Sequence, residues 1–238
     1  MQTKEVDTII GDLKRLGNLE KAQAVQRFFK TGKGHYAEGD IFWGITVPSV
    51  RKIAHHYKDL ATKNLETLLT HEVHEIRLCA LLIMVFRAKS EPKIMYHLYL
   101  EKISFVNNWD LVDLSAPAII GNFLINSDKA ILYTLAQSPS LWERRIAIVA
   151  TFAFIKQGQY TDTINIATIL MHDKNDLIHK SVGWMLREVG KRCSVTVLEA
   201  FLEVHAATMP RTMLRYAIEH LHPEKKKMFM QAKHLLVL

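Results

Sequence analysis

The sequence predicts an all-α protein whose helices form a repeating array, an α-solenoid. Apolar residues recur at helical spacing along almost the whole chain, no stretch alternates convincingly with a period of two, and one short pattern returns at intervals near 35 residues. With 238 residues, 49% of them apolar, the chain can bury a core without disulfides or metal ions. We expect a single domain over residues 1–238.

The first helix is predicted from Val6, Ile9 and Leu13, which share one face at helical spacing. A long irregular segment is expected from Gly32 to Trp43, because glycines are concentrated in and beside it. The remaining breaks are short, and roughly thirteen or fourteen helices of ordinary length are expected. Several helix starts are marked by a Ser or Thr cap or by a first-turn proline. These signals are Thr46 before Val47-Pro48, Ser90 before Glu91-Pro92, Ser138 beside Pro139, Met209-Pro210 before Arg211, and Pro223 before Glu224.

A basic residue followed by small and apolar residues recurs four times. The four segments are Arg77-Leu78-Cys79-Ala80, Arg145-Ile146-Ala147-Ile148, Lys180-Ser181-Val182-Gly183 and Arg215-Tyr216-Ala217-Ile218. The last two intervals are 35 residues and the first is 68, so a missing member falls near Val112-Asp113. A period of this size with two helices per unit is typical of HEAT-like solenoids, although helical hairpins of common length also recur at such spacing by chance.

If the repeat holds, equivalent helices line one face and Arg77, Arg145, Lys180 and Arg215 form a basic row suited to a phosphate backbone. Asp113 is then the single acid in that row. The net charge of +7 and the pI near 9.3 also favour a polyanionic partner, with solubility as the alternative reading.

Two cysteines, Cys79 and Cys193, lie far apart in apolar helical contexts and are expected to be unpaired core thiols in a reducing compartment. The start of the chain has no basic segment followed by an apolar run, and no apolar stretch reaches the ~20 residues that span a bilayer. We therefore expect a soluble cytoplasmic protein with no membrane partner.

Trp109 and Asp113 are four residues apart, so a helix beginning near Trp109 presents an indole and a carboxylate on one face. An acid in a polyanion-binding row suits a substrate that develops positive charge, such as the oxocarbenium-like sugar formed when a glycosidic bond breaks. The Trp109 indole beside this acid, with that of Trp184 as the second candidate, could hold a cation or a sugar. Each such contact has a favourable interaction energy of roughly 0.5 to 2 kcal/mol. The alternative is that Trp109 belongs to the core and Asp113 pairs with Arg145.

Other chemistries have little support in the sequence. His71 with His74, and His220 with His222, have no Cys or carboxylate cluster that completes a metal-ligand set, and we expect surface or half-buried histidines. The segment Gly32-Lys33-Gly34 lacks the spacing of a phosphate-binding loop, and no Gly-x-Ser-x-Gly elbow is present. The sequence therefore gives little support to a metal centre, a phosphate-binding loop or a serine hydrolase.

Five segments, in order over nearly the whole chain, resemble the AlkD-type alkylpurine DNA glycosylases. They are Gly39-Asp40-Ile41-Phe42-Trp43-Gly44-Ile45 with Pro48 and Arg51, Trp109 to Asp113 with Pro117, Trp142-Glu143-Arg144-Arg145, Gly183-Trp184-Met185-Leu186-Arg187-Glu188, and Pro210-Arg211 to Ala217. The resemblance implies a C-shaped stack of HEAT-like helix pairs that grips double-stranded DNA in a concave basic face. It also implies hydrolysis of the N-glycosidic bond of cationic N3- or N7-alkylated purines, in base excision repair, without a cofactor.

Carried onto this chain, the resemblance makes Asp113 the catalytic carboxylate and Trp109 and Trp184 the aromatic walls beside the lesion's deoxyribose. Arg145 matches a phosphate-binding arginine and Arg187 a further basic position. With these we place Lys180, Arg77, Arg215 and Arg51 in the DNA-binding set, and we expect a monomer that associates with the nucleoid when on DNA. Two rival functions remain: a non-catalytic DNA-structure-binding protein on the same scaffold, and a protein-interaction solenoid.

Overall fold

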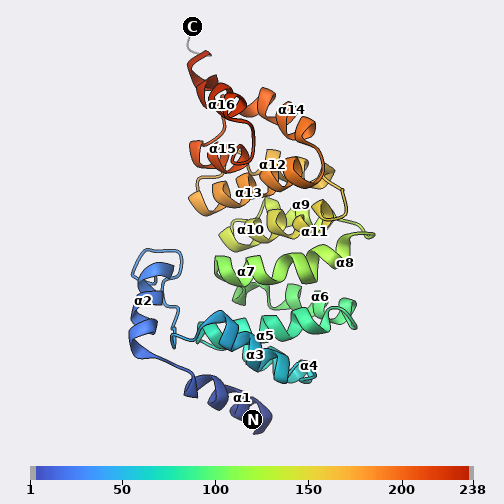
Figure 1. Cartoon of the computed structure of the whole chain (residues 1–238). Helices are drawn as coiled ribbons and strands as arrows, with labels where there is room; N and C mark the ends of the chain where they lie inside the picture. The colour runs from blue at the N-terminus through green and yellow to red at the C-terminus, as the bar shows by residue number, and fades with distance from the viewer. Residues whose placement is uncertain (1–3, 236–238) are drawn as a thin grey trace. The chain divides into compact units, whose positions relative to one another are not determined.

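The computed structural model describes residues 4–235, and these form 16 α-helical segments with two short 3-10 or π turns between them (Figure 1). The β-type pairing among the described residues is one isolated bridge between Ile41 and Val73. The all-α prediction is therefore confirmed. None of the helices in this described part is both long and apolar enough to cross a bilayer.

The chain divides into two compact units, Met1–Phe123 and Leu124–Leu238, which we describe separately. The single domain expected over residues 1–238 stays a prediction. The elements of the N-terminal unit are α1 (Lys4–Arg15), α2 (Leu19–Phe29), α3 (Val47–His56), α4 (Thr62–Leu69), α5 (His74–Arg87), α6 (Pro92–Glu101), η1 (Ile103–Phe105), α7 (Trp109–Ala116) and the π-helical turn η2 (Pro117–Gly121), with α8 (Asn122–Leu124) at the division.

Helix α5 is the centre of the N-terminal unit, because it packs against α3, α4, α6 and α7 and is buried over most of its length (Figure 1). Helices α3, α5 and α7 are successive neighbours, and α4 and α6 pack against them. Residues 30–46 carry no α-helix, which confirms the irregular segment expected from Gly32 to Trp43.

The C-terminal unit repeats this plan with α13 at its centre, packed against α10, α12, α14 and α15 (Figure 1). Its elements are α9 (Ala130–Ala136), α10 (Leu141–Ala150), α11 (Phe152–Ile155), α12 (Thr161–Ile169), α13 (Asp176–Arg192), α14 (Val195–His205), α15 (Arg211–Ala217) and α16 (Pro223–Leu235). Within each unit, alternating helices thus form a row with partners packed against it. This arrangement is consistent with a solenoid of helical repeats.

The predicted repeat register is present in the helices of both units. Asp113, Arg145, Lys180 and Arg215 are each the fifth residue of their helix, and Arg77 is the fourth residue of α5. The pattern read from the sequence therefore marks the same turn of five helices. It does not determine how exposed those side chains are.

Most helix starts agree with their sequence signals, since α3, α6 and α15 begin at Val47, Pro92 and Arg211. The helix that Ser138 and Pro139 signal is α10, and its N-terminal cap is Ser140, two residues after Ser138. Ser138 accepts a hydrogen bond from the Ser140 N–H and so forms the preceding turn, while Ser140 caps α10 by accepting from the Glu143 N–H.

The close contact of α13 with α15 depends on Gly183. A Cβ atom built there lies 2.5 Å from the Met213 carbonyl oxygen and 2.5 Å from the Tyr216 Cβ. Gly183→Ala is expected to lower the free energy of unfolding by about 1–3 kcal/mol through overpacking. Gly11→Ala is the matched control, because a Cβ in α1 meets nothing within 4 Å and the change should stabilise the helix by about 0.5–1 kcal/mol. Chemical denaturation measures both, and an unchanged midpoint for Gly183→Ala would contradict the tight approach.

Candidate nucleic-acid interface

Helix α7 begins at Trp109 because Asn108 caps it. The Asn108 side chain accepts a hydrogen bond from the Trp109 N–H at 2.8 Å, and the Asp110 side chain accepts from the Leu111 N–H at 2.9 Å. These bonds satisfy first-turn donors that a helix otherwise leaves without partners. Trp109 and Asp113 are then one turn apart on α7, and both are half-buried, as the four-residue spacing predicts.

Trp109 belongs to an aromatic cluster built with α2. Its ring stacks on Phe29 with centroids 5.0 Å apart and 12° between the planes, and Phe28 meets it edge-on at 5.9 Å. Phe29 is buried and Phe28 is 66% exposed. One face of the Trp109 indole is therefore covered by protein, as the core reading expects in part, and a binding role for this residue stays a prediction.

Asp113 of α7 is near enough to Tyr99 of α6 for its charge to act on the Tyr99 hydroxyl. Burial and the nearby charge of Asp113 raise the pKa of the Tyr99 hydroxyl well above its usual value, against the opposing effect of its hydrogen bond with Ser115. Tyr99 is fully buried, whereas Asp113 is half-buried. The site thus has an acid at the rim of an apolar interior, where a charge acts more strongly than it does in bulk water.

A buried polar network joins the start of α7 to α5 and to the irregular segment. His74 contacts two carboxylates: its Nε2 lies 2.8 Å from Asp110 and its Nδ1 lies 3.3 Å from Asp40. Asn108 donates to Asp40 at 3.2 Å. The expectation that His74 is a surface or half-buried histidine is wrong, since only 1% of it is exposed, whereas His71 is half-buried as expected.

The network shifts the ionisation of its members. Burial lowers the pKa of His74, but its hydrogen bonds to Asp110 and Asp40 outweigh burial, so the pKa is raised above the usual histidine value. Burial raises the pKa of Asp40, but the hydrogen bond from His74 and the charge of Arg77 outweigh it, so that pKa is lowered. Both shifts favour an ion pair in the folded protein.

Arg77 belongs to this network and not to an outward-facing basic row, which corrects its place in the predicted DNA-binding set. It is 3% exposed and donates to Asp40 at 2.6 Å and to Asn107 at 3.1 Å. It also donates to the carbonyls of residues 71 and 72, each at 2.9 Å. Its charge is used to neutralise Asp40 and to hold the turn before α5.

The motif from Gly39 to Ile45 positions α2. The Glu75 carboxylate accepts hydrogen bonds from the backbone N–H groups of three successive residues, Trp43, Gly44 and Ile45, at 2.8–3.1 Å. Gly44 has φ +75°, and a Cβ there would lie 2.3 Å from the Asn18 carbonyl oxygen beside the start of α2. The motif therefore fixes the helix that carries Phe28 and Phe29.

Trp184 lies on α13 in the C-terminal unit, where it is half-buried and packs at 5.8 Å against Phe152. Lys156 and Arg192 lie over the Phe152 ring at 4.6 Å and 5.4 Å. Trp184 is thus one side of a partly exposed aromatic and basic surface of its unit. Such a surface can hold an anionic or aromatic ligand.

The family assignment rests on a match over most of the chain. Residues 9–221 match the family described as DNA alkylation repair enzyme. The chain belongs to that family. The resemblance to AlkD-type proteins is confirmed. Membership of this family implies that DNA is the partner, and it supports a role in the repair of alkylated DNA.

Two solved structures share the fold of this DNA alkylation repair family member. A predicted DNA alkylation repair enzyme from Enterococcus faecalis is 16% identical with TM-score 0.67, covering 87% of this chain and 97% of its own. AlkD2 from Streptococcus mutans is 16% identical with TM-score 0.55, covering 92% and 99%. Among curated proteins, none matches the chain.

The remaining basic residues of the predicted DNA-binding set differ in how available they are to DNA. Arg145 is buried and donates to the Leu177 carbonyl at 2.6 Å, which supports the first turn of α13. Lys180 pairs with Asp176, and Arg187 pairs with Glu188 and Glu219. Arg51 and Arg215 are exposed. These two are therefore the members of the set that the structure shows as exposed.

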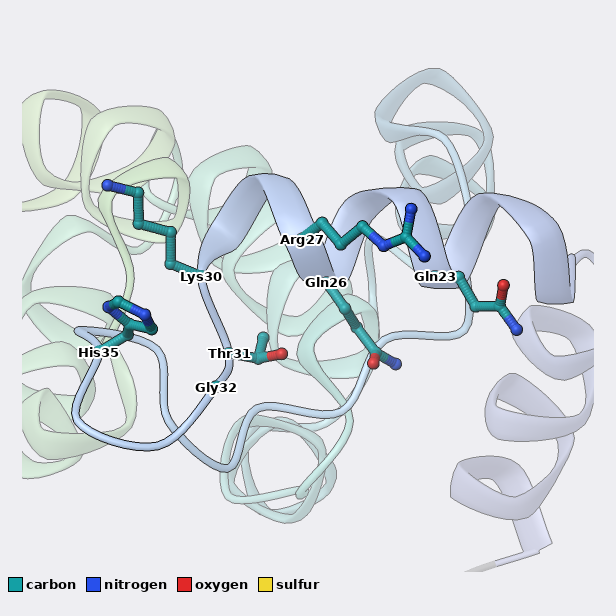
Figure 2. Close-up of a pocket in the computed structure, with 7 residues that line it drawn as sticks. All are labelled: Gln23, Gln26, Arg27, Lys30, Thr31, Gly32 and His35. Carbon is teal, nitrogen blue, oxygen red and sulfur yellow. The ribbon is translucent and has the colours of Figure 1, made fainter.

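Sequence reasoning missed a basic pocket at the end of α2 in the N-terminal unit of this repair protein. The pocket has a volume of about 480 Å³, and Arg27 and Lys30 of α2 and His35 of the following loop supply its basic groups (Figure 2). Gln23 and Gln26 add amides, and no carboxylate lines it. Arg27, Lys30, Lys33 and His35 are close in sequence, and this cluster beside the glycine-rich segment is the signal that could have identified it.

Proposed function

We propose that this protein is a DNA glycosylase that hydrolyses the N-glycosidic bond of purines made cationic by N3 or N7 alkylation. The observation that carries the proposal is the pair of half-buried side chains on α7, the Trp109 indole and the Asp113 carboxylate, one turn apart. A purine that already bears a positive charge is a good leaving group. The reaction then needs stabilisation of the sugar cation more than it needs an acid.

In the proposed mechanism, the Asp113 carboxylate faces the deoxyribose and stabilises the positive charge that develops on it as the bond breaks. It also orients a water molecule for addition to the sugar, which leaves an abasic site and the free base. Trp109 and Trp184 are proposed to contact the sugar and the lesion. No metal or nucleotide takes part in the proposed reaction.

DNA binding is proposed to use Arg51, Lys180, Arg187 and Arg215, together with the α2 pocket formed with Arg27 and Lys30. Arg145 would act at the phosphate nearest the lesion while also supporting α13. Affinity should fall steeply with salt, because each phosphate contact releases a counterion.

The test is release of free 7-methylguanine and 3-methyladenine from methylated duplex DNA, measured by chromatography with EDTA present. We expect metal-independent release that leaves abasic sites, which alkali then cleaves. Release that EDTA abolishes, or cleavage without free base, would contradict the proposal.

A second candidate is a DNA-structure-binding protein without excision activity. It is favoured by the coverage of one face of Trp109 by Phe29, which leaves less of the indole for a ligand. This function predicts salt-sensitive retention on immobilised duplex or branched DNA with no base release. A protein-interaction solenoid, by contrast, would show no retention at ~100 mM salt.

A further inference from the structure

The His74 side chain has two acidic contacts and no other role in the proposed reaction. Ionised carboxylates can only accept hydrogen bonds, so Nε2 facing Asp110 and Nδ1 facing Asp40 must both carry a proton. The geometry therefore describes an imidazolium held between two acids. With Arg77 on Asp40, two buried positive groups balance two buried negative groups.

Both acids are connected to the candidate site. Asp110 is the residue after Trp109, and Asp40 accepts from Asn108, the residue that caps α7. The His74 ring also stacks on Phe42 at 4.4 Å and lies 5.4 Å from Phe29, which is the ring that covers Trp109. His74 thus contacts two groups that hold Trp109 in place. One is Asp110, the next residue along the backbone, and the other is Phe29, whose ring stacks on the Trp109 indole.

We propose that His74, as an imidazolium bridging Asp40 and Asp110, is a positioning residue that sets the orientation of Trp109 and so controls excision. The inference rests on the proposed function for its catalytic consequence. Loss of the imidazolium proton leaves one buried negative charge without a partner, which is costly in a low-dielectric interior. The two acids then separate, and α7, the irregular segment and the aromatic cluster lose their common anchor.

The charged groups that face His74 are few. Asp110 comes from α7, Asp40 from the irregular segment and Arg77 from α5 itself, while α2 contributes only the uncharged Phe29. The pKa of His74 is higher in the folded protein than its usual value, so the stabilisation of the folded state by the His74 ion pairs is fully present below that usual value. It is lost as the pH rises through the raised folded-state pKa.

The deciding measurement is a pH titration of the full-length protein labelled with 5-fluorotryptophan, in which Trp109→Phe identifies the Trp109 fluorine signal. We expect that signal to titrate with the same midpoint as the His74 ring, followed by histidine NMR, and above the usual histidine pKa. His74→Gln should abolish this titration, while His97→Gln, at an exposed position of the same unit, should leave it intact. A Trp109 signal that is constant while His74 titrates would overturn the proposal.

The excision rates of His74→Gln and of one double variant separate charge from shape. His74→Gln is expected to slow single-turnover excision about tenfold at saturating enzyme, while DNA affinity changes less than about threefold. Adding Asp110→Asn removes the uncompensated charge and should restore most of the rate, which a purely steric role does not predict. A double variant as slow as the single one would contradict the charge balance.

The fluorine titration needs no catalytic activity. If the wild type releases no alkylated base, the proposed function fails, and the titration alone still decides whether His74 positions Trp109.

Discussion

Asp113→Asn is expected to lower the single-turnover rate of alkylpurine release by roughly two orders of magnitude or more, the usual cost of removing one key electrostatic group from a transition state. Asparagine keeps the size and position of the side chain one turn from Trp109 on the capped α7. It removes the negative charge that we propose stabilises the sugar cation. The rate should be measured with enzyme in excess over DNA carrying a single lesion.

Affinity for the same duplex should stay similar or rise in this variant, because a negative charge is removed from the proposed DNA-binding surface. Asp59→Asn is the matched control, since Asp59 is an exposed acid of the same unit and undergoes the same change of charge. Its release rate should equal that of the wild type. A release rate that Asp113→Asn leaves unchanged would exclude the proposed role for this carboxylate.

Arg77→Ala is expected to lower the free energy of unfolding by about 3–5 kcal/mol, because it leaves Asp40 as a buried charge that has lost its arginine partner. The variant also removes donors to Asn107 and to two carbonyls before α5. Urea denaturation followed by far-UV circular dichroism measures the change.

Arg215→Ala is the contrasting change, because Arg215 is an exposed arginine at the equivalent turn of α15. It should alter stability by less than about 0.5 kcal/mol and lower the salt dependence of DNA binding by about one phosphate contact. Equal stability losses in the two variants, or a larger loss of DNA affinity in an intact Arg77→Ala protein, would contradict the assignment of Arg77 to the interior.

The sequence predicted the fold well where the signals are local. Helical periodicity and first-turn prolines involve residues within one or two turns of each other, so α3, α6 and α15 begin where expected. The repeat was also readable, because equivalent helices place the same residue types at the same turn. The spacing of Trp109 and Asp113 is a property of one helix and needs no knowledge of tertiary structure.

What the sequence could not predict depends on contacts between distant segments. Arg77 and Arg215 share one pattern, yet Arg77 is buried because Asp40 and Asn107, 37 and 30 residues away, accept from it. His74 resembles an ordinary polar residue until its partners, 34 and 36 residues away, are placed. The packing of Phe29 on Trp109 likewise needed the tertiary structure. The pattern identifies which residues are equivalent, and the neighbours determine what each one does.

The most direct test of the central claim is a parallel assay of wild type and Asp113→Asn for free 3-methyladenine and 7-methylguanine released from methylated duplex DNA with EDTA present. Our account predicts release of both bases by the wild type and its near-complete loss in the variant, with DNA binding retained. Absence of release by a wild-type protein that still binds DNA with strong salt dependence would contradict the glycosylase function and favour DNA-structure binding.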